Sequence, residues 1–370
     1  MNKPAILHIC LSKGWGGLEM YPIRTGKEFI NRGYKVYGLC VAGTQVAQGM
    51  QEVGIKTFEV SGKGHLIFKE LPKLNRWLIQ NNISLIHCHK SGDILISALL
   101  NLFSKRKTFF TEHMGVTRPK KDLYHKLAYS HVDKVFSISE ETYKRNIRSL
   151  PVSKNKITRL WLGTDIPSNP EYDIDTINKI KDELKLPKES IVLGNIGRVC
   201  SGKGQMELLE AFSLLQHRHP TLHLLIVGGL DTSEGSDNLF VQQIKDRVTK
   251  LSLDDRVHFT GFRKDTERML AVMEIVCLPN HNEAFGLTAI EAMAYKKAIV
   301  CSNTGALPEI LGHSAILCNP LEPDSISQGI EQYVIDPKLK QNNAKLAHER
   351  ALAEFSTASH ISSLERFYQS

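Results

Sequence analysis

The sequence predicts an α/β protein built from two facing, doubly wound (Rossmann-like) domains. Short runs of Val, Ile and Leu alternate with amphipathic stretches along the chain, as in parallel sheets covered by helices on both faces. The alternation restarts after residues 163–189, a polar, acidic stretch with three prolines. The length of 370 residues also exceeds the usual size of one domain. We therefore expect domains over 1–168 and 169–357, with a ligand cleft between them.

The apolar runs are the expected strands. In the first domain they are 5–11, 35–41, 83–88, 107–111, 134–139 and 157–162. In the second they are 191–196, 222–227, 256–260, 275–279, 298–302 and 314–318. Helices are expected between them, at 18–32, 69–81, 204–218, 238–251 and 338–354.

Composition and cysteine usage indicate a globular protein of the reducing cytosol. Hydrophobic residues make up 42% and charged residues 23%, which argues against disordered, collagen-like and coiled-coil classes. The seven cysteines are odd in number and lie mostly in apolar runs, so we expect free thiols. The longest apolar stretch, 94–103, is about half of the roughly 20 residues that a bilayer crossing needs. We expect any membrane contact to be peripheral.

The positive charge is concentrated in the first domain. The net charge of +8 favours an anionic partner. Residues 1–170 contain 26 Lys and Arg against 12 Asp and Glu, a balance of +14, whereas residues 171–370 contain 21 against 27, a balance of −6. Nucleic acid is disfavoured as the partner, because no reading motif or aromatic stacking platform accompanies the charge.

The most informative segment is 282–292, which follows an expected strand and opens a helix near Phe285. Free N–H groups at a helix start bind anions, and Gly286 lets a phosphate approach closely. Glu283 and Glu291 add two carboxylates, which suits a ligand with both hydroxyls and phosphates. The alternative is two ordinary glutamates near a helix start.

A glycine-rich turn, 197–204, follows the expected strand 191–196. It superficially fits the phosphate-binding pattern G-x-x-x-x-G-K-[ST], but Gly204 stands where Ser or Thr must hold magnesium. Arg198 and Lys203 remain as two cations suited to a diphosphate. A solvated basic turn is the alternative.

A second glycine loop, 12–19, follows the first strand. It begins like a dinucleotide fingerprint, but Glu19 replaces the third glycine, so an NAD site is disfavoured. Gly16 and Gly17 would still admit a ligand to the start of the next helix. A merely tight turn is the alternative.

Three histidines end strands of the first domain. His87 and His89 alternate with Cys88, so the two rings share one face of the sheet. Nearby residues do not complete a tetrahedral set, and we expect no metal. His113 ends the next strand and is expected at the same edge.

Residues 118–127 alternate cations with Leu123, Tyr124 and Leu127 at helical spacing. Two interpretations stand equally. The segment is a peripheral helix attracted to anionic lipid, or a solvated helix whose apolar stripe packs inward.

Together these segments resemble the retaining glycosyltransferases of family 4 (glycosyltransferase group 1), which have the two-domain GT-B fold. The resemblance covers essentially the whole chain, and its most specific parts are Arg198 with Lys203-Gly204 and the Glu283 to Glu291 segment. The other matching segments are Gly16-Gly17-Leu18-Glu19, 86–89, 111–113, 163–165, 227–229 and 259–262. Thr164 and Gly229 depart from the family's common residues, Val and an acidic residue.

The resemblance implies a role for each site residue. Arg198 and Lys203 would neutralise the donor diphosphate, and Glu283 would bind sugar hydroxyls. His113 would lie near the transferred sugar. The donor-binding residues would be Gly16, Gly17, Phe285, Gly286, Leu287 and Glu291.

The resemblance also implies a reaction. A sugar would pass from a nucleotide-diphosphate sugar to a hydroxyl of a saccharide acceptor, with retention, without metal or cofactor, in lipopolysaccharide or other surface polysaccharide biosynthesis. The acceptor-side domain is the basic one, so we expect an anionic or lipid-linked acceptor and a cytoplasmic protein, peripheral on the inner face of the membrane. Residues 358–370 would cross back to the first domain. The alternatives are a nucleotide-sugar epimerase of similar fold and a non-catalytic nucleotide-sugar-binding subunit.

Overall fold

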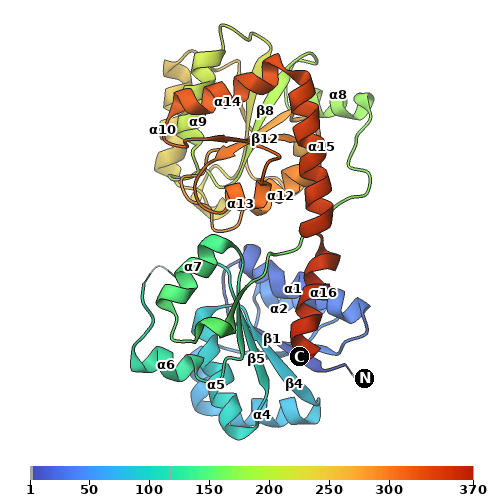
Figure 1. Cartoon of the computed structure of the whole chain (residues 1–370), viewed down its shortest axis with the longest axis vertical. Coiled ribbons are helices and arrows are strands. Elements are labelled where there is room, and N and C mark those ends of the chain that lie inside the picture. Colours follow the sequence, from blue (N-terminus) through green and yellow to red (C-terminus); the bar gives the residue numbers. More distant parts are fainter. Residues whose placement is uncertain (1–2, 117, 370) are drawn as a thin grey trace. The chain divides into compact units, whose positions relative to one another are not determined.

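The computed structural model describes residues 3–116 and 118–369 and divides the chain into two compact units (Figure 1). Unit 1 comprises Met1–Gly163 and Thr357–Ser370, and unit 2 comprises Thr164–Ser356. The first boundary lies five residues before the expected one, and helix α16 (Thr357–Gln369) belongs to unit 1. The cleft between the domains stays a prediction.

Within the described residues, unit 1 contains a seven-stranded sheet in the order β3-β2-β1-β4-β5-β6-β7. Every neighbouring pair is parallel. The central strands are buried on both faces, which explains their nearly continuous apolar sequences. The strands are β1 (Ala5–Cys10), β2 (Val36–Val41), β3 (Lys56–Val60), β4 (Ile83–Cys88), β5 (Lys107–Glu112), β6 (Lys134–Ser137) and β7 (Ile157–Arg159).

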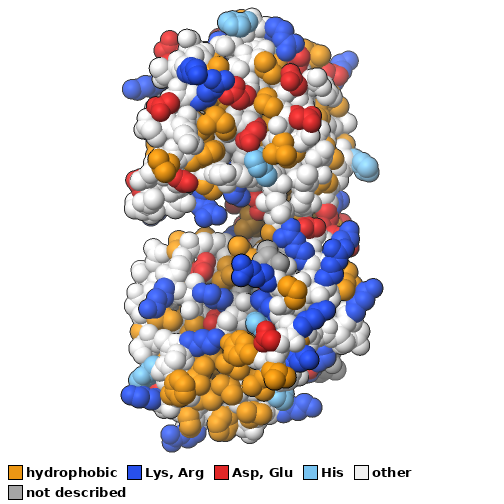
Figure 2. All heavy atoms as spheres, turned by 90° about the vertical axis from the view of Figure 1, so that its left-hand side faces the viewer, with side chains coloured by type: hydrophobic (Ala, Val, Ile, Leu, Met, Phe, Trp, Pro, Cys, Tyr) orange, Lys and Arg blue, Asp and Glu red, His pale blue; other side chains and the backbone are white. Residues whose placement is uncertain are grey.

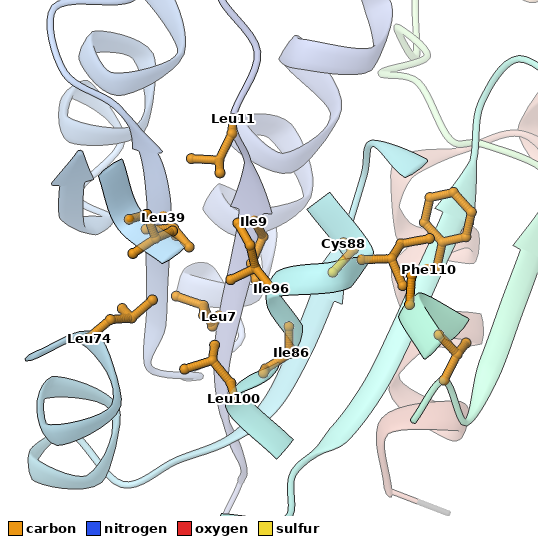
Figure 3. Close-up of a cluster of buried hydrophobic side chains, with 14 of the residues drawn as sticks. Leu7, Ile9, Leu11, Leu39, Leu74, Ile86, Cys88, Ile96, Leu100 and Phe110 are labelled. Carbon is orange, nitrogen blue, oxygen red and sulfur yellow. The ribbon is translucent and has the colours of Figure 1, made fainter. Parts of the chain in front are cut away.

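Helices cover both faces of this sheet. One face packs Leu7, Ile9, Leu39, Ile86 and Leu100 into a core (Figure 3). The opposite face packs against α1 (Gly17–Asn31) and α16. The remaining helices are α2 (Gln45–Glu52), α3 (Lys63–His65), α4 (Leu71–Gln80), α5 (Ile94–Phe103), α6 (Leu123–Tyr129) and α7 (Glu140–Ser149).

Unit 2 contains a six-stranded sheet, again parallel throughout its described strands, in the order β10-β9-β8-β11-β12-β13. Its strands are β8 (Ile191–Ile196), β9 (Leu222–Val227), β10 (Val257–Phe259), β11 (Ile275–Leu278), β12 (Ala298–Ser302) and β13 (Ile316–Cys318). Its helices are α8 (Ile174–Glu183), α9 (Gln205–Leu215), α10 (Asn238–Lys250), α11 (Thr266–Val272), α12 (Leu287–Ala294), α13 (Leu307–Leu311), α14 (Pro323–Ile335) and α15 (Pro337–Glu354).

Both sheets reverse their strand order between the first and fourth strands of the unit. The reversal lies between β1 and β4 in unit 1 and between β8 and β11 in unit 2. In open parallel sheets, ligands bind beyond the carboxyl ends of the strands at this point. The fold therefore singles out the loops after β8 and β11, where the sequence predicted the donor site.

The predicted α/β class and all twelve predicted strands are confirmed, but two details were wrong. The edge strand β3 was missed, because polar residues interrupt it. A helix was predicted over 118–127, but α6 begins only at Leu123. Asp122 is its N-cap, and its side chain accepts the His125 N–H. Helix α12 begins at Leu287, two residues after Phe285, because Gly286 adopts a left-handed conformation.

All seven cysteines are free, as expected from the sequence, and six of them are buried. None of the described helices combines the length and apolar character that a bilayer crossing requires.

Candidate active site

Two loops converge at the carboxyl edge of the unit 2 sheet. Residues 197–204 join β8 to α9, and residues 279–286 join β11 to α12. Because β8 and β11 are neighbours, both loops leave the sheet side by side. His281 ties them together: its N–H donates to the Gly202 carbonyl at 3.0 Å, and its Nε2 lies 2.9 Å from Glu207 Oε1 on α9.

Gly204 lets the two loops pack closely. It has a φ of 76° and forms the N-cap of α9. A Cβ at this position would lie 2.0 Å from the carbonyl oxygen of Pro279, which no real structure allows. The glycine that excluded a magnesium-binding P-loop in the sequence is therefore required for a different reason, namely contact with the second loop.

Lys203 and Glu283 form an ion pair across the two loops. Lys203 Nζ lies 2.8 Å from Glu283 Oε2, and Asn280 Nδ2 donates to the same oxygen at 2.7 Å. Burial acts to raise the pKa of Glu283, but the Lys203 ammonium and these hydrogen bonds outweigh it and hold the pKa below its usual value. Glu283 is therefore ionised in the free protein, beside a cation.

Arg198, on the same loop as Lys203, is an exposed cation. Its carbonyl oxygen accepts a hydrogen bond from Gln205 Nε2 at 3.0 Å, which fixes the backbone of the turn. Its guanidinium makes no ion pair with any residue that the structure describes. Lys203 is engaged and Arg198 is free, so an incoming anion meets Arg198 without competition from a carboxylate.

The start of α12 supplies backbone donors beside the ion pair. Gly286 has a φ of 99° and forms the N-cap, with no side-chain acceptor for the first N–H groups. These groups carry the positive end of the helix dipole. Phe285 is buried and lies 6.4 Å from Phe355, ring to ring. Glu291, one turn after Leu287, is partly exposed on the same side of the helix.

A third loop, after β12, packs against the backbone of Glu283. The Ala306 N–H donates to the Glu283 carbonyl at 2.8 Å. A Cβ on Gly305 would lie 2.7 Å from both the nitrogen and the carbonyl oxygen of Glu283. Thr304 Oγ1 donates to the His281 carbonyl at 2.8 Å. The backbone that carries the Glu283 carboxylate is therefore held by contacts among the loops after β8, β11 and β12.

The glycine loop of unit 1 occupies the corresponding place in its own sheet. The Leu11 N–H donates to Asp93 Oδ2 at 2.8 Å, which joins the loops after β1 and β4. Ser12 Oγ donates to Glu19 Oε1 at 2.6 Å, so the glutamate folds back towards the loop. Gly16 caps α1, and Gly17 is the first residue of that helix.

His113 belongs to a buried histidine cluster of unit 1. His8 Nδ1 lies 2.8 Å from His89 Nε2, and the ring of Tyr21 lies 4.9 Å from that of His113. Burial lowers the pKa of His8 and of His113 to about 3, so both rings are neutral. His87 and His89 share one face, as predicted, at centroids 4.4 Å apart, while Cys88 packs in the core of the other face.

One ring nitrogen from each of His8, His87 and His89 lies within 4.8 Å of the other two, close enough to consider a metal. His87 uses both of its nitrogens, towards Tyr368 at 2.5 Å and Thr111 at 2.8 Å. Only His8 Nε2 and His89 Nδ1 lack a partner among these three rings. Two nitrogens fall short of the three or four protein ligands of a zinc site, so we assign His8, His87 and His89 a structural role.

The predicted site residues fall into two groups. Unit 2 brings together Arg198, Lys203, Glu283, Phe285, Gly286, Leu287 and Glu291 on two adjacent loops and one helix start. Gly16, Gly17 and His113 lie in unit 1, at the carboxyl ends of β1 and β5. Sequence reasoning missed Asn280 and His281, which position the loops. Their place directly after β11 was the available signal.

Comparison with known proteins identifies related chains. Residues 176–350 match the model "Glycosyl transferases group 1", and residues 15–166 match "Glycosyltransferase Family 4". A capsular polysaccharide biosynthesis glycosyltransferase, CapM, of Staphylococcus aureus is 27% identical over 66% of this chain and 64% of its own length. A lipopolysaccharide core biosynthesis mannosyltransferase, LpcC, of Rhizobium leguminosarum is 29% identical over 50% of this chain and 52% of its own. The chain thus aligns with about half to two thirds of these relatives' length.

Solved structures share the fold over the whole chain. A glycosyltransferase from Rickettsia africae has a TM-score of 0.89 at 20% identity and covers 100% of this chain and 98% of its own. HepE of Anabaena, solved in complex with UDP and glucose, has a TM-score of 0.80 at 20% identity, with 99% of each chain covered. The two family models together span most of the sequence, so the chain belongs to the GT-B glycosyltransferases of group 1 and family 4.

Proposed function

We propose that the protein is a retaining glycosyltransferase that moves a sugar from a nucleotide-diphosphate sugar to a hydroxyl of a saccharide acceptor. The observation that carries this proposal is the Lys203–Glu283 ion pair beside the start of α12. It combines a cation for phosphate, a carboxylate for sugar hydroxyls and free backbone N–H groups in one place. The UDP and UDP-glucose complexes of HepE, a chain of the same fold, support a nucleotide sugar as the donor.

Arg198 and Lys203 are the proposed catalytic cations. Negative charge develops on the leaving diphosphate in the transition state. Two fixed cations and the start of a helix stabilise the transition state more than the bound donor, because the charge is greater there. Such a site needs no metal ion and no cofactor. The acceptor hydroxyl would attack on the face that the diphosphate leaves, and a phosphate oxygen would receive its proton.

The remaining residues position the donor. Glu283 would accept hydrogen bonds from sugar hydroxyls, and Glu291 would do the same for the ribose. The backbone of Phe285, Gly286 and Leu287 would bind the sugar and phosphate at the helix start.

Unit 1 is the proposed acceptor half. His113 is neutral, so it can donate or accept a hydrogen bond near the transferred sugar without adding charge. Gly16 and Gly17 would give the diphosphate close access to the start of α1. The excess of cations in residues 1–170 favours an anionic or lipid-linked saccharide, and CapM and LpcC support a role in surface polysaccharide biosynthesis. The proposed location is the cytoplasmic face of the membrane.

A nucleotide-sugar screen tests the proposal. UDP-, GDP- and ADP-sugars are added singly, and the melting temperature identifies the donor, because a bound ligand stabilises the folded state. That donor is then incubated with saccharide acceptors, and the anomeric configuration of any product is read by NMR. Transfer with retention supports the proposal. Inversion overturns the retaining mechanism, isomerisation of the donor indicates an epimerase, and binding without turnover indicates a non-catalytic subunit.

A further inference from the structure

Unit 1 carries a contiguous apolar surface on two helices, α5 and α6, which pack against each other. Leu95, Leu99, Leu102 and Phe103 form a stripe along α5 that becomes more exposed towards its carboxyl end, where Leu102 is 68% and Phe103 54% exposed. We call these side chains, with Leu123, Tyr124 and Leu127 of α6, the α5–α6 surface. Figure 2 shows hydrophobic side chains gathered in this region of unit 1 and bordered by Lys and Arg.

The α6 half of the surface decides between the two interpretations of segment 118–127. Leu123 is 83%, Tyr124 50% and Leu127 53% exposed, so this stripe does not pack inward. Ala128 and Tyr129 make the buried contacts of the helix instead. Exposed clusters of large apolar side chains mark binding surfaces in proteins that fold independently.

Six cations lie on or next to these two helices in the sequence, and Figure 2 shows Lys and Arg around the apolar side chains. They are Lys105 and Lys107, just after α5, Arg118, Lys120 and Lys121, just before α6, and Lys126 on α6 itself. The neighbouring Arg106 is different: it is buried and donates to the Ile83 carbonyl and to Asn75 Oδ1, so it serves the fold.

Acidic groups next to the surface are occupied locally. Asp122 caps α6 and lies 2.6 Å from His125 Nδ1, and Asp133 Oδ2 accepts the Thr108 N–H. A second copy of the chain docked on this surface would therefore bring cations against cations. An apolar centre with a cationic rim fits an anionic bilayer instead, where the leucines enter the headgroup boundary and the lysines meet phosphates.

We propose that the α5–α6 surface docks the protein peripherally on an anionic lipid bilayer. This deepens the proposed function, on which it rests for the lipid-linked acceptor, and it extends the contact from segment 118–127 to the carboxyl end of α5.

The experiment is sedimentation of the full-length protein with vesicles, in the absence of donor. One vesicle set contains equal parts of phosphatidylglycerol and phosphatidylcholine, and the other contains phosphatidylcholine alone. The test variants are Leu123→Ser with Leu127→Ser, and Lys121→Glu with Lys126→Glu. The matched control combines Leu239→Ser, Lys245→Glu and Lys250→Glu on the exposed face of α10 in unit 2.

We expect wild type and the α10 control to bind the anionic vesicles equally and the zwitterionic vesicles much more weakly. The leucine pair should weaken anionic binding at least about tenfold. The lysine pair should weaken it at least about twentyfold, since each cation near an anionic surface strengthens binding about fivefold.

Three results would overturn the proposal: no sedimentation of wild type with anionic vesicles, equal binding of both vesicle types, or unchanged binding by both variants. Loss of a wild-type dimer in the leucine pair, seen by size exclusion without vesicles, would instead assign the surface to a second copy. The lysine pair changes exposed side chains only, so it keeps the test valid if the leucine pair misfolds. Stabilisation by the donor nucleotide is measured separately, so failure of membrane docking is distinguished from failure of the proposed transferase.

Discussion

Lys203 Nζ lies 2.8 Å from Glu283 Oε2, and this ion pair joins two loops that are 80 residues apart in the chain. A diphosphate that binds Lys203 has to compete with the carboxylate already there. The pair therefore holds both side chains in position before the donor arrives, and the donor replaces one interaction with another.

Glu283→Gln should separate nucleotide binding from transfer. It leaves Lys203 without a carboxylate, so binding of the free nucleoside diphosphate should stay the same or tighten up to about fivefold, the range for a partly exposed ion pair. The transfer rate should fall at least about tenfold, since a neutral amide binds sugar hydroxyls more weakly than a carboxylate. Calorimetry and initial rates measure the two effects.

Glu210→Gln is the matched control, because Glu210 forms a partly exposed ion pair with Arg247 of α10 and belongs to neither loop of the proposed site. It should leave both quantities close to wild type. Clearly weaker nucleoside diphosphate binding in Glu283→Gln would contradict the competition between the carboxylate and the diphosphate.

Two glycines of one loop should respond differently to alanine. Gly202 and Gly204 both have positive φ, but only Gly204 would bring a Cβ against the second loop, at the Pro279 carbonyl. Gly202→Ala should lower the free energy of unfolding by about 1 kcal/mol, the cost of a left-handed alanine. Gly204→Ala should cost at least about 3 kcal/mol, because backbone has to move as well. Urea unfolding of both variants checks this, and equal losses would show that the loops do not pack as described.

The histidine cluster should make the protein unstable in acid. Burial lowers the pKa of His8 and His113 to about 3 and that of His360 to about 4. The unfolded chain binds these protons near pH 6.5 and the folded chain does not, so stability is complete above pH 6.5 and falls as the pH drops towards 4. Each group contributes up to about 1.4 kcal/mol per pH unit in that window.

His360→Asn should flatten this slope by about one proton between pH 6.5 and pH 4.5. Wild type, measured alongside, gives the reference slope. The free energy of unfolding, measured in urea at several pH values, gives both slopes. A slope in His360→Asn equal to that of wild type would mean that His360 is protonated in the folded protein.

The fold could be predicted because buried parallel strands and the helices between them give a regular alternation of apolar runs and amphipathic stretches in the sequence. Strands such as β1 and β9 are buried on both faces and therefore read as nearly continuous apolar runs, each interrupted by one histidine. The edge strand β3 faces solvent along much of its length, so its sequence, Lys56 to Val60, lacks that pattern. Asp122, the N-cap of α6, is a typical helix-start residue. It was overlooked because the cations before it were included in the expected helix.

The residues of the candidate site could be predicted from the sequence, but the contacts between their side chains could not. Glycines and charges after strand ends indicated Arg198, Lys203 and Glu283, because parallel strands end at one edge. The pairing of Lys203 with Glu283 depends on β8 lying next to β11, which a single sequence does not reveal. His8 was missed for the same reason, since it meets His87 only through the pairing of β1 with β4.

The central claim is that Arg198 and Lys203 hold the donor diphosphate. The most direct measurement compares wild type with Arg198→Ala combined with Lys203→Ala, using donor affinity by calorimetry and the rate of sugar transfer. We predict a folded protein with wild-type melting temperature to within a few degrees, donor binding weakened at least about a hundredfold, and no measurable transfer. Transfer by the double variant at a rate near that of wild type would contradict the assignment.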